Sequence, residues 1–585
     1  MWKTPASALH VLPVYIEERH SGSFYFLADN LDWDTSYHLL LFDHHSDAGE
    51  VFNSDYVRRE LAASGPGGRE VLFSLLKKRG AVQDSNWYEP LMPKPVTAVT
   101  WVPGPVLSRA QARRAMAHVR EKINGHEEAA PRESGDLSKL VVVRDFAGQK
   151  AVTAFDLPVA ASLDLDYFNG VPDGDLESAV DRVFDYLLSI DRLAVLTIAV
   201  STMYHPSPGR ATRVFELALR RCLYIVNARL RMEPFADNGP DLSPEAAALY
   251  KKKSRPPSLL QEGMTVGVRD LIAECAGLMQ VENESGKWQR LVESWKKESA
   301  SRPRLRVLGS IVKIESDGFS IIGKRNDITL SLEHADGTEG WETVRWRALV
   351  PAGARFNLVG DGASFARGAP RHVFYREKEL PNLKGRTSLT LDDIRPVFAG
   401  LTGMGTIRLC AETGEGPLAR RTPLARITSM EGETFVGRLT GAFGLPYAFG
   451  AGMLCRGGVP VPDALYAADC VSFMIRALRC GGGRVPYTNP GGFRKYLKRL
   501  VEVKHFPGGV AHNDNGPLRI DSGMLQRGLV LHFGVHVAAL YRDMEPRGLL
   551  SENDLVVHHL EGFPEIVPLK NLSYARRPFE VLLVK

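Results

Sequence analysis

Two segments of the chain are apolar through their centres and have the length of strands. They are "YHLLLFD" at 37–43 and "RLAVLTIAVS" at 192–201. A strand with two apolar faces belongs in a parallel sheet that helices cover on both sides. The segment "LESAVDRVFDYLLSI" at 176–190 has the spacing of an amphipathic helix. Residues 1–235 are therefore expected to form a three-layer α/β domain around a parallel sheet.

The remaining sequence indicates further domains, as expected for 585 residues, which are too many for one hydrophobic core. Residues 236–305 are polar and end in "SWKKESASRPRLR", which predicts a helical extension and a linker. Residues 306–424 alternate short strands with Gly and Asp turns, which is typical of a β-sandwich. Residues 425–585 mix helical and strand patterns and are expected to form an α+β domain. The predicted fold class is therefore multidomain.

Composition excludes some classes of function and favours a location. The net charge is +5 and dispersed, which argues against nucleic acid as a partner. No apolar run reaches the roughly 18 residues of a membrane span, and the N-terminal segment is expected to be a strand, with no secretion signal. The six cysteines form no CxxC pair, which favours reduced thiols and a cytoplasmic protein.

Acidic and histidine side chains follow two of the predicted strands. Asp43, His45 and Asp47 form a D-x-H-x-D pattern, and Asp164 and Asp166 form D-x-D in "ASLDLDYF". Alternate side chains on extended backbone point the same way, and ligands of open α/β sheets bind beyond the carboxyl ends of the strands. Oxygen and imidazole ligands suit Mn, Fe or Zn. The pattern predicts a metal site; the alternative is a solvated turn and a helix cap.

These residues resemble the arginase/deacetylase superfamily of metal-dependent hydrolases, whose pattern is an upstream His, then D-x-H-x-D, then S-x-D-x-D. His20 in "EERHSG" lies 23 residues before Asp43 and supplies the upstream histidine. The resemblance implies two Mn²⁺ ions, with Zn²⁺ or Fe²⁺ as alternatives, that activate water to attack an amidine or amide carbon. It implies one metal surrounded by His20, Asp43, Asp47 and Asp164. It implies a second surrounded by Asp43, His45, Asp164 and Asp166, with Asp43 and Asp164 bridging.

The match departs from the ureohydrolases after the second acidic pair. Their Asp-Pro is replaced by "YFNGVPDGD", and no carboxylate for a substrate guanidinium can be placed. The segment looks closer to an uncharacterised arginase-like branch, so arginine is not the expected substrate. His44 and His205 are candidates for proton transfer or for supporting a ligand; each is otherwise a structural or loop histidine.

A single cysteine has the setting of a nucleophile. Cys470 begins the predicted helix "CVSFMIRALRC", where the helix dipole is expected to lower the pKa of the thiol. His536 and the pair His558 and His559 lie on two apolar segments predicted to be neighbouring strands. Nucleophile, base and orienting residue on such elements follow the Cys-His-X logic of nucleophilic catalysis. The alternative is a buried structural cysteine.

The segments "GLPYAFG", "DCVSF" and "HVAALY" resemble the NlpC/P60-type papain-like hydrolases over about residues 435–585. The resemblance implies Cys470 as nucleophile, His536 as base, His559 (or His558) as the orienting residue, and Tyr447 near the oxyanion. An uncharacterised bacterial branch, often preceded by an Ig-like domain, looks closer still. "SIVKIESDGFSIIGKRNDITLSLEHADG" at 310–337 resembles such Ig-like modules, which are usually exported.

Together these patterns predict a bifunctional hydrolase. A dinuclear Mn centre would hydrolyse an amidine or amide C–N bond, and a Cys-His domain would cleave an amide or peptide bond. The expected partner is a small-molecule or peptide substrate with such a bond, and the oligomeric state is left open. The alternatives are a binding or scaffold protein with one or both sites decayed, and a thioester acyltransferase at Cys470. All six metal positions and both Cys and His are filled, which argues against decay.

Overall fold

The computed structural model divides into two compact units, one made of Val11–Tyr224 and Ala228–Ser299, the other mainly of Ala300–Lys585. The structure describes residues 11–48, 51, 54–64, 69–79, 81–104, 140–142, 156–190, 192–233, 265–281, 287–298, 304–308, 312–315, 318–323, 328–333, 344–353, 355–357, 372–398, 403–413 and 420–585.

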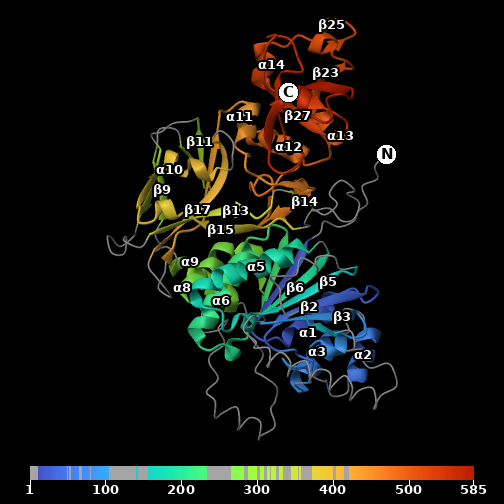
Figure 1. Cartoon of the computed structure of the whole chain (residues 1–585), viewed down its shortest axis with the longest axis vertical. Coiled ribbons are helices and arrows are strands. Elements are labelled where there is room, and N and C mark those ends of the chain that lie inside the picture. The colour runs from blue at the N-terminus through green and yellow to red at the C-terminus, as the bar shows by residue number, and fades with distance from the viewer. Residues whose placement is uncertain are drawn as a thin grey trace. The chain divides into compact units, whose positions relative to one another are not determined.

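The first unit contains an eight-stranded sheet in which all neighbouring strands are parallel (Figure 1). The strand order is β4-β3-β2-β5-β6-β1-β7-β8. The strands are β1 (Leu12–Glu17), β2 (Tyr37–Asp43), β3 (Val96–Pro103), β4 (Leu140–Val142), β5 (Val159–Asp164), β6 (Leu193–Ala199), β7 (Ala228–Glu233) and β8 (Met279–Val281). The prediction of a parallel sheet is confirmed, and β8 from the predicted helical extension forms one edge.

Helices cover both faces of this sheet. The described helices are α1 (Gly22–Asn30), α2 (Ser54–Ala63), α3 (Arg69–Arg79), α5 (Leu176–Ser189), α6 (Pro208–Leu223), α8 (Val266–Cys275) and α9 (Lys287–Glu298). On one face Leu39 and Leu41 of β2 share a core with α1, α2 and α3. On the other face the Phe42 ring contacts Tyr186 of α5. Figure 1 shows α1–α3 in blue and α5 and α6 in green on opposite sides of the sheet. The α/β class is therefore confirmed, whereas the arginase-like fold stays a prediction.

The second unit begins with two sheets that share one core. The larger sheet has the order β10-β11-β19-β17-β13-β15, with β18 beside β17, and the smaller has the order β16-β12-β9. Trp346 and Leu409 from the larger sheet and Leu330 and Leu389 from the smaller are buried together. The strands are β9 (Arg304–Leu308), β10 (Val312–Glu315), β11 (Gly318–Ile322), β12 (Thr329–Glu333), β13 (Arg345–Pro351), β15 (Tyr375–Glu379), β16 (Ser388–Thr390), β17 (Gly405–Thr413), β18 (Arg420–Arg421) and β19 (Ala425–Met430).

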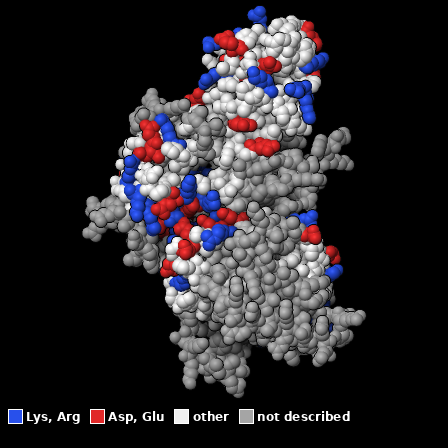
Figure 2. Space-filling view, viewed as in Figure 1, with Lys and Arg blue, Asp and Glu red and all other residues white. Residues whose placement is uncertain are grey.

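This β-rich part carries charges of both signs. Along β15, Arg376, Glu377, Lys378 and Glu379 follow one another, and Arg421 forms an ion pair with Glu377. Figure 2 shows Lys and Arg side chains interspersed with Asp and Glu over this region. An Ig-like topology for the two sheets stays a prediction.

The rest of the second unit is a six-stranded antiparallel sheet with helices against it. Its order is β23-β30-β26-β27-β28-β29, and its two faces pack into two separate cores. The strands are β23 (Leu497–Val503), β26 (Leu529–His532), β27 (Val537–Arg542), β28 (Leu555–His558), β29 (Glu565–Pro568) and β30 (Phe579–Val584). The helices of the unit are α10 (Leu391–Ile394), α11 (Phe435–Thr440), α12 (Cys470–Cys480), α13 (Pro490–Phe493) and α14 (Ser522–Arg527). Short paired strands complete it: β14 (Arg355–Asn357) with β20 (Tyr447–Phe449), β21 (Cys455–Arg456) with β22 (Val459–Pro460), and β24 (His512–Asn513) with β25 (Gly516–Pro517).

The second unit has its own largely antiparallel sheets in addition to the parallel sheet of the first, which bears out the multidomain class, while the NlpC/P60 fold of the last part stays a prediction. Within the described residues, no helix combines the length and the apolar character needed to cross a membrane.

The centre of the parallel sheet should dominate the stability of the first unit. Leu196 of β6 is fully buried, so Leu196→Ala is expected to cost about 2–5 kcal/mol through lost burial and a cavity. Hydrogen exchange of β5 and β6 peptides, followed by mass spectrometry, measures this locally in a chain with more than one unit. Arg59→Ala on the exposed side of α2 is the control and should change little. Equal protection in both variants would contradict the prediction.

Candidate functional site

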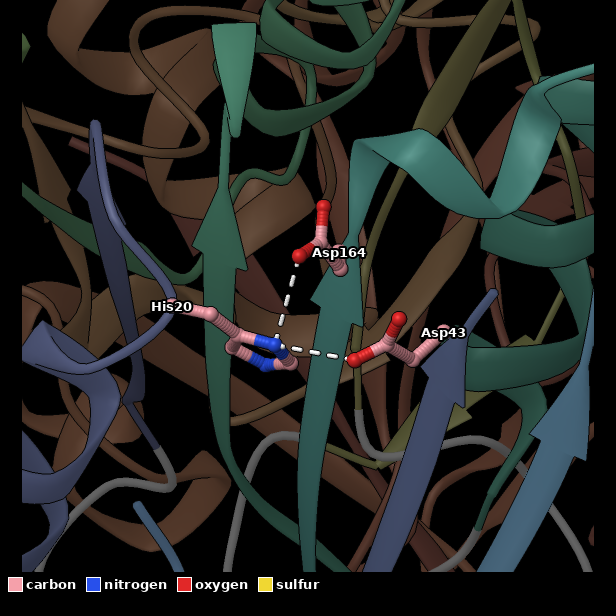
Figure 3. A group of neighbouring side chains, drawn as sticks. All are labelled: His20, Asp43 and Asp164. Atoms are coloured by element: carbon pink, nitrogen blue, oxygen red, sulfur yellow. Dashed lines mark ion pairs between the residues drawn. The ribbon is translucent and has the colours of Figure 1, made fainter. Parts of the chain in front are cut away.

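Three strands bring the predicted metal ligands to one edge of the parallel sheet. Asp43 ends β2, Asp164 ends β5, and His20 follows β1 after two further residues. In the strand order β2-β5-β6-β1 these strands lie within four positions of one another. Because the strands are parallel, their carboxyl ends meet at the same edge. Figure 3 shows Asp43 and Asp164 at the ends of their strands and His20 on the loop after β1, with the three side chains pointing toward one another.

His20 faces three carboxylates at close range. Its Nδ1 lies 3.0 Å from Asp43 Oδ2, 2.9 Å from Asp47 Oδ2 and 3.3 Å from Asp164 Oδ2. All four side chains are buried. These are the four residues that the family resemblance assigns to one metal, and the structure brings them together.

A second group shares Asp43 with the first. His45 Nδ1 lies 3.2 Å from Asp166 Oδ2 and 3.7 Å from Asp43 Oδ1. One ligand atom from each of these three residues lies within 4.8 Å of the others. Asp164 groups with His20 and Asp43, and its role as a second bridging ligand stays a prediction. The His45 side chain is 54% exposed, so this group is the one that solvent reaches.

Two residues that sequence reasoning missed hold the carboxylates in place. The Trp87 indole Nε1 donates to Asp47 Oδ2 at 2.9 Å, and the Ser201 hydroxyl donates to Asp164 Oδ2 at 2.7 Å. Asp47 and Ser201 both adopt a positive φ, 48° and 50°, which is unusual for residues other than glycine. Such backbone strain persists only where the surroundings enforce it, and it clusters at functional sites. No local sequence signal points to Trp87, whereas Ser201 could have been suspected because it follows the apolar strand β6.

The electrostatics of this cluster favour a bound cation. Burial, reinforced by Asp47, Asp166 and Asp164, raises the pKa of Asp43 well above its usual range. Burial and Asp166 raise the pKa of Asp164 to about 6. Burial opposes a charge on His20, but its three carboxylate neighbours outweigh that and raise its pKa well above the ordinary value. Several carboxylates buried together are costly unless a positive charge compensates them.

The hydrogen-bonding pattern provides an independent test of whether these residues fit a metal. Buried polar atoms are nearly always hydrogen-bonded. In this part of the described chain, His20 Nδ1, Asp43 Oδ2 and Asp166 Oδ2 are buried and make no well-aligned hydrogen bond beyond the ion-pair contacts given above. These atoms belong to the two groups above, and the mixed nitrogen and oxygen donors suit Mn, Fe or Zn. The residues therefore fit a metal ion.

His44 and His205 lie beside this cluster. The backbone N–H of His44 donates to Asp166 Oδ1 at 3.2 Å, and His205 Nε2 lies 3.1 Å from the Val200 carbonyl oxygen. Burial lowers the pKa of both imidazoles. Their roles in proton transfer stay predictions.

The second predicted site differs from its sequence-based expectation in the state of the thiol. Cys470 does begin α12, and Asp469 caps that helix in a reciprocal pair with Ser472. Burial, followed by the adjacent Asp469 carboxylate, raises the pKa of the Cys470 thiol far above its usual value. The prediction that the helix dipole lowers this pKa is therefore wrong, because desolvation and a neighbouring negative charge outweigh the dipole.

His536 and Cys470 lie on opposite faces of the antiparallel sheet. Cys470 shares a core with Val537 and Ala539 of β27, whereas Ala538 belongs to the core on the other face. The His536 ring stacks on Tyr574 at 5.2 Å between ring centroids, on that other face. In this fully described region neither ring nitrogen of His536 makes a hydrogen bond, and burial lowers the pKa of His536 to about 3. The structure thus does not bring the proposed base to the proposed nucleophile.

The strand register separates the two adjacent histidines. His558 pairs with Ala538 and its ring contacts His536 at 5.5 Å, so it lies on the face away from Cys470. The His559 ring contacts Phe473 of α12 at 5.7 Å and Tyr447 at 5.3 Å, on the face of Cys470. Tyr447 is buried in β20. Of the predicted residues, the structure groups His559 and Tyr447 beside α12 and excludes His536 from that group.

Comparison with known proteins adds no further constraint. No protein-family model matches the chain, and no curated protein or solved structure matches it significantly. Functional proposals therefore rest on the geometry of the residues themselves.

The raised pKa of Cys470 predicts slow reaction with alkylating agents. At pH 8, iodoacetamide should modify Cys470 at least about tenfold more slowly than the exposed Cys455 and Cys480, because little thiolate forms and the sulfur is buried. Peptide mass spectrometry over time measures the rates, with urea-unfolded protein as the control in which the three react alike. Preferential labelling of Cys470 would contradict this and restore it as a candidate nucleophile.

Proposed function

We propose that the α/β unit is a metal-dependent hydrolase that cleaves a C–N bond of an amide or amidine. The observation that supports this proposal is the meeting of six ligand-type side chains in two groups that share Asp43. A decayed site would be expected to lack one of these side chains, so their retention in contact argues for a working centre over a scaffold.

The residues divide into those that hold a metal and those that move protons. His20, Asp43, Asp47 and Asp164 would hold one ion, and Asp43, His45 and Asp166 a second. Divalent ions held there would supply Lewis-acid activation of water and of the substrate carbonyl or amidine. His44 and His205 have lowered pKa values and are neutral near pH 7, so either ring can take up a proton from water and then deliver that proton to the leaving amine.

The exposed side of the cluster indicates where substrate approaches. His45 is the most exposed of the ligands, and the Tyr204 ring lies 5.7 Å from its ring. Tyr204 is itself exposed. Its aromatic ring offers a surface at this rim against which the apolar part of an amide or acetylated amine can pack.

The proposal is confined to this unit. A second hydrolase activity, or an acyltransferase activity, at Cys470 stays a prediction that has lost support, because His536 faces away from the thiol and burial keeps the thiol protonated.

Metal content is the first test. Protein loaded with Mn²⁺ and desalted should retain metal, measured by inductively coupled plasma mass spectrometry. Asp164→Ala removes a ligand and should lower the affinity at least about tenfold. The matched control is Asp55→Asn, which removes a carboxylate that is 75% exposed on α2 and should leave the metal content unchanged. No retained metal in the wild-type protein would refute the proposal.

Turnover is the second test. The Mn²⁺-loaded protein should release an amine from at least one member of a panel of acetylated amines, amides and amidines. Asp164→Ala should lose this activity and Asp55→Asn should keep it. Activity that survives Asp164→Ala would assign the reaction to another site. Metal binding without turnover of any class would make the centre a binding or structural site.

A further inference from the structure

A line of buried hydroxyl groups connects His20 to a second carboxylate that belongs to neither metal group. His20 Nε2 lies 2.8 Å from Ser162 Oγ, which lies 2.8 Å from Thr197 Oγ1. Thr197 Oγ1 lies 3.0 Å from Ser23 Oγ, and Ser23 Oγ donates to Glu17 Oε1 at 2.9 Å. The five residues are at most 4% exposed.

The line crosses the sheet beneath the metal ligands. Ser162 of β5 and Thr197 of β6 are register partners, Glu17 ends β1, and Ser23 lies in α1. Ser162 and Thr197 interrupt strands that are otherwise apolar, "VAASLD" and "LAVLTIA". A buried polar group in such a strand is costly unless it is hydrogen-bonded, so the hydroxyls are stable there only as members of a connected network.

The backbone makes room for the far end of the line. A Cβ atom added at Gly22 would lie 1.2 Å from Glu17 Oε2, so the carboxylate occupies the space that a side chain at this position would fill. A side chain at residue 22 would therefore require the Glu17 carboxylate to move. This observation is independent of the hydrogen bonds and shows that the carboxylate uses the space that glycine leaves open.

The hydroxyl chain has a direction that bears on metal binding. The heavy-atom geometry allows Thr197 to donate to Ser162, and Ser23 to donate to Thr197 or to Glu17. Ser23 has only one hydrogen to give, and each hydroxyl can turn, so the bonds along the line can run in either of two senses. If they run toward Glu17, Ser162 accepts from His20 Nε2–H, and Nδ1 presents its lone pair to the cluster of Asp43, Asp47 and Asp164. If they run toward His20, Ser162 donates to Nε2, and the ring hydrogen sits on Nδ1, where it blocks a metal.

We propose that Glu17, acting through Ser23, Thr197 and Ser162, holds His20 in the tautomer whose Nδ1 binds metal. Glu17 is the terminal acceptor, and the four residues are positioning residues that touch no metal. The inference rests on the proposed metal centre and extends the usual pairing of a metal-bound histidine with a carboxylate from one bond to a relay of three hydroxyls.

Removal of one hydroxyl tests the relay. Thr197→Val keeps the shape of the side chain but breaks the line, and Thr197→Ser restores a hydroxyl as the rescue variant. Titration with Mn²⁺, followed by the electron paramagnetic resonance signal of free Mn²⁺, gives the affinity without any assay of activity. Thr197→Val should weaken binding about 10–100-fold, and Thr197→Ser should recover most of the loss.

A second pair of variants keeps the test decisive if Thr197→Val does not fold. Gly22→Ala should displace the Glu17 carboxylate and weaken Mn²⁺ binding, whereas Gly209→Ala in α6, where a Cβ meets no atom within 4 Å, should not. Circular dichroism establishes that each variant is folded.

Two different failures are distinguishable in this experiment. Wild-type protein that binds no Mn²⁺ would refute the metal centre itself. Wild-type protein that binds Mn²⁺, with Thr197→Val binding as tightly as Thr197→Ser, would refute the relay alone. In ¹⁵N-histidine NMR of the Zn²⁺-loaded protein, a proton on Nε2 of His20 is the expected result, and a proton on Nδ1 would also overturn the relay.

Discussion

Three buried carboxylates around one imidazole are the interaction on which the candidate metal site of the α/β unit depends. Asp43, Asp47 and Asp164 all lie within 3.3 Å of His20 Nδ1. Only a sheet with parallel strands brings the ends of β1, β2 and β5 to one edge, because antiparallel neighbours would send alternate ends to opposite edges. The sheet is stabilised by burial of apolar side chains on both faces, so hydrophobic packing maintains a concentration of charge that a cation would neutralise.

Much of this arrangement is predictable from the sequence, for a physical reason. Apolar strands with polar tips identify both the sheet and the edge at which ligands meet, and alternation along D-x-H-x-D places its members together. What sequence could not supply is the set of long-range supports. Trp87 and Ser201 come from distant segments, and the positive φ of Asp47 is enforced by contacts that no local pattern encodes.

The prediction of a lowered pKa for Cys470 is wrong because burial in the tertiary structure outweighs a local rule. A thiol at a helix start does feel the dipole, but the rule says nothing of how deeply the sulfur is buried or of which charge lies beside it. His536 lies away from Cys470 for another reason. The side chains of a strand alternate between faces, so Val537 and Ala539 point toward Cys470 and a residue one position earlier points away. The alternation of side chains along "HVAALY", combined with its apolar pattern, already indicates that His536 and Val537 face opposite sides of the sheet.

The buried hydroxyl groups show that polar exceptions within apolar strands can belong to the candidate metal site. Serine and threonine inside apolar strands weaken the hydrophobic pattern and would be dismissed as tolerated exceptions in a sequence reading. Their geometry indicates a role, because Ser162 and Thr197 are register partners and lie on the hydrogen-bonded line between His20 and Glu17. A ligand histidine needs its second nitrogen controlled as much as its first, since a ring hydrogen on the wrong atom removes the lone pair that binds metal. Exceptions to an apolar pattern that lie beneath a ligand cluster are thus part of the site, and they extend it from the sheet edge into the core.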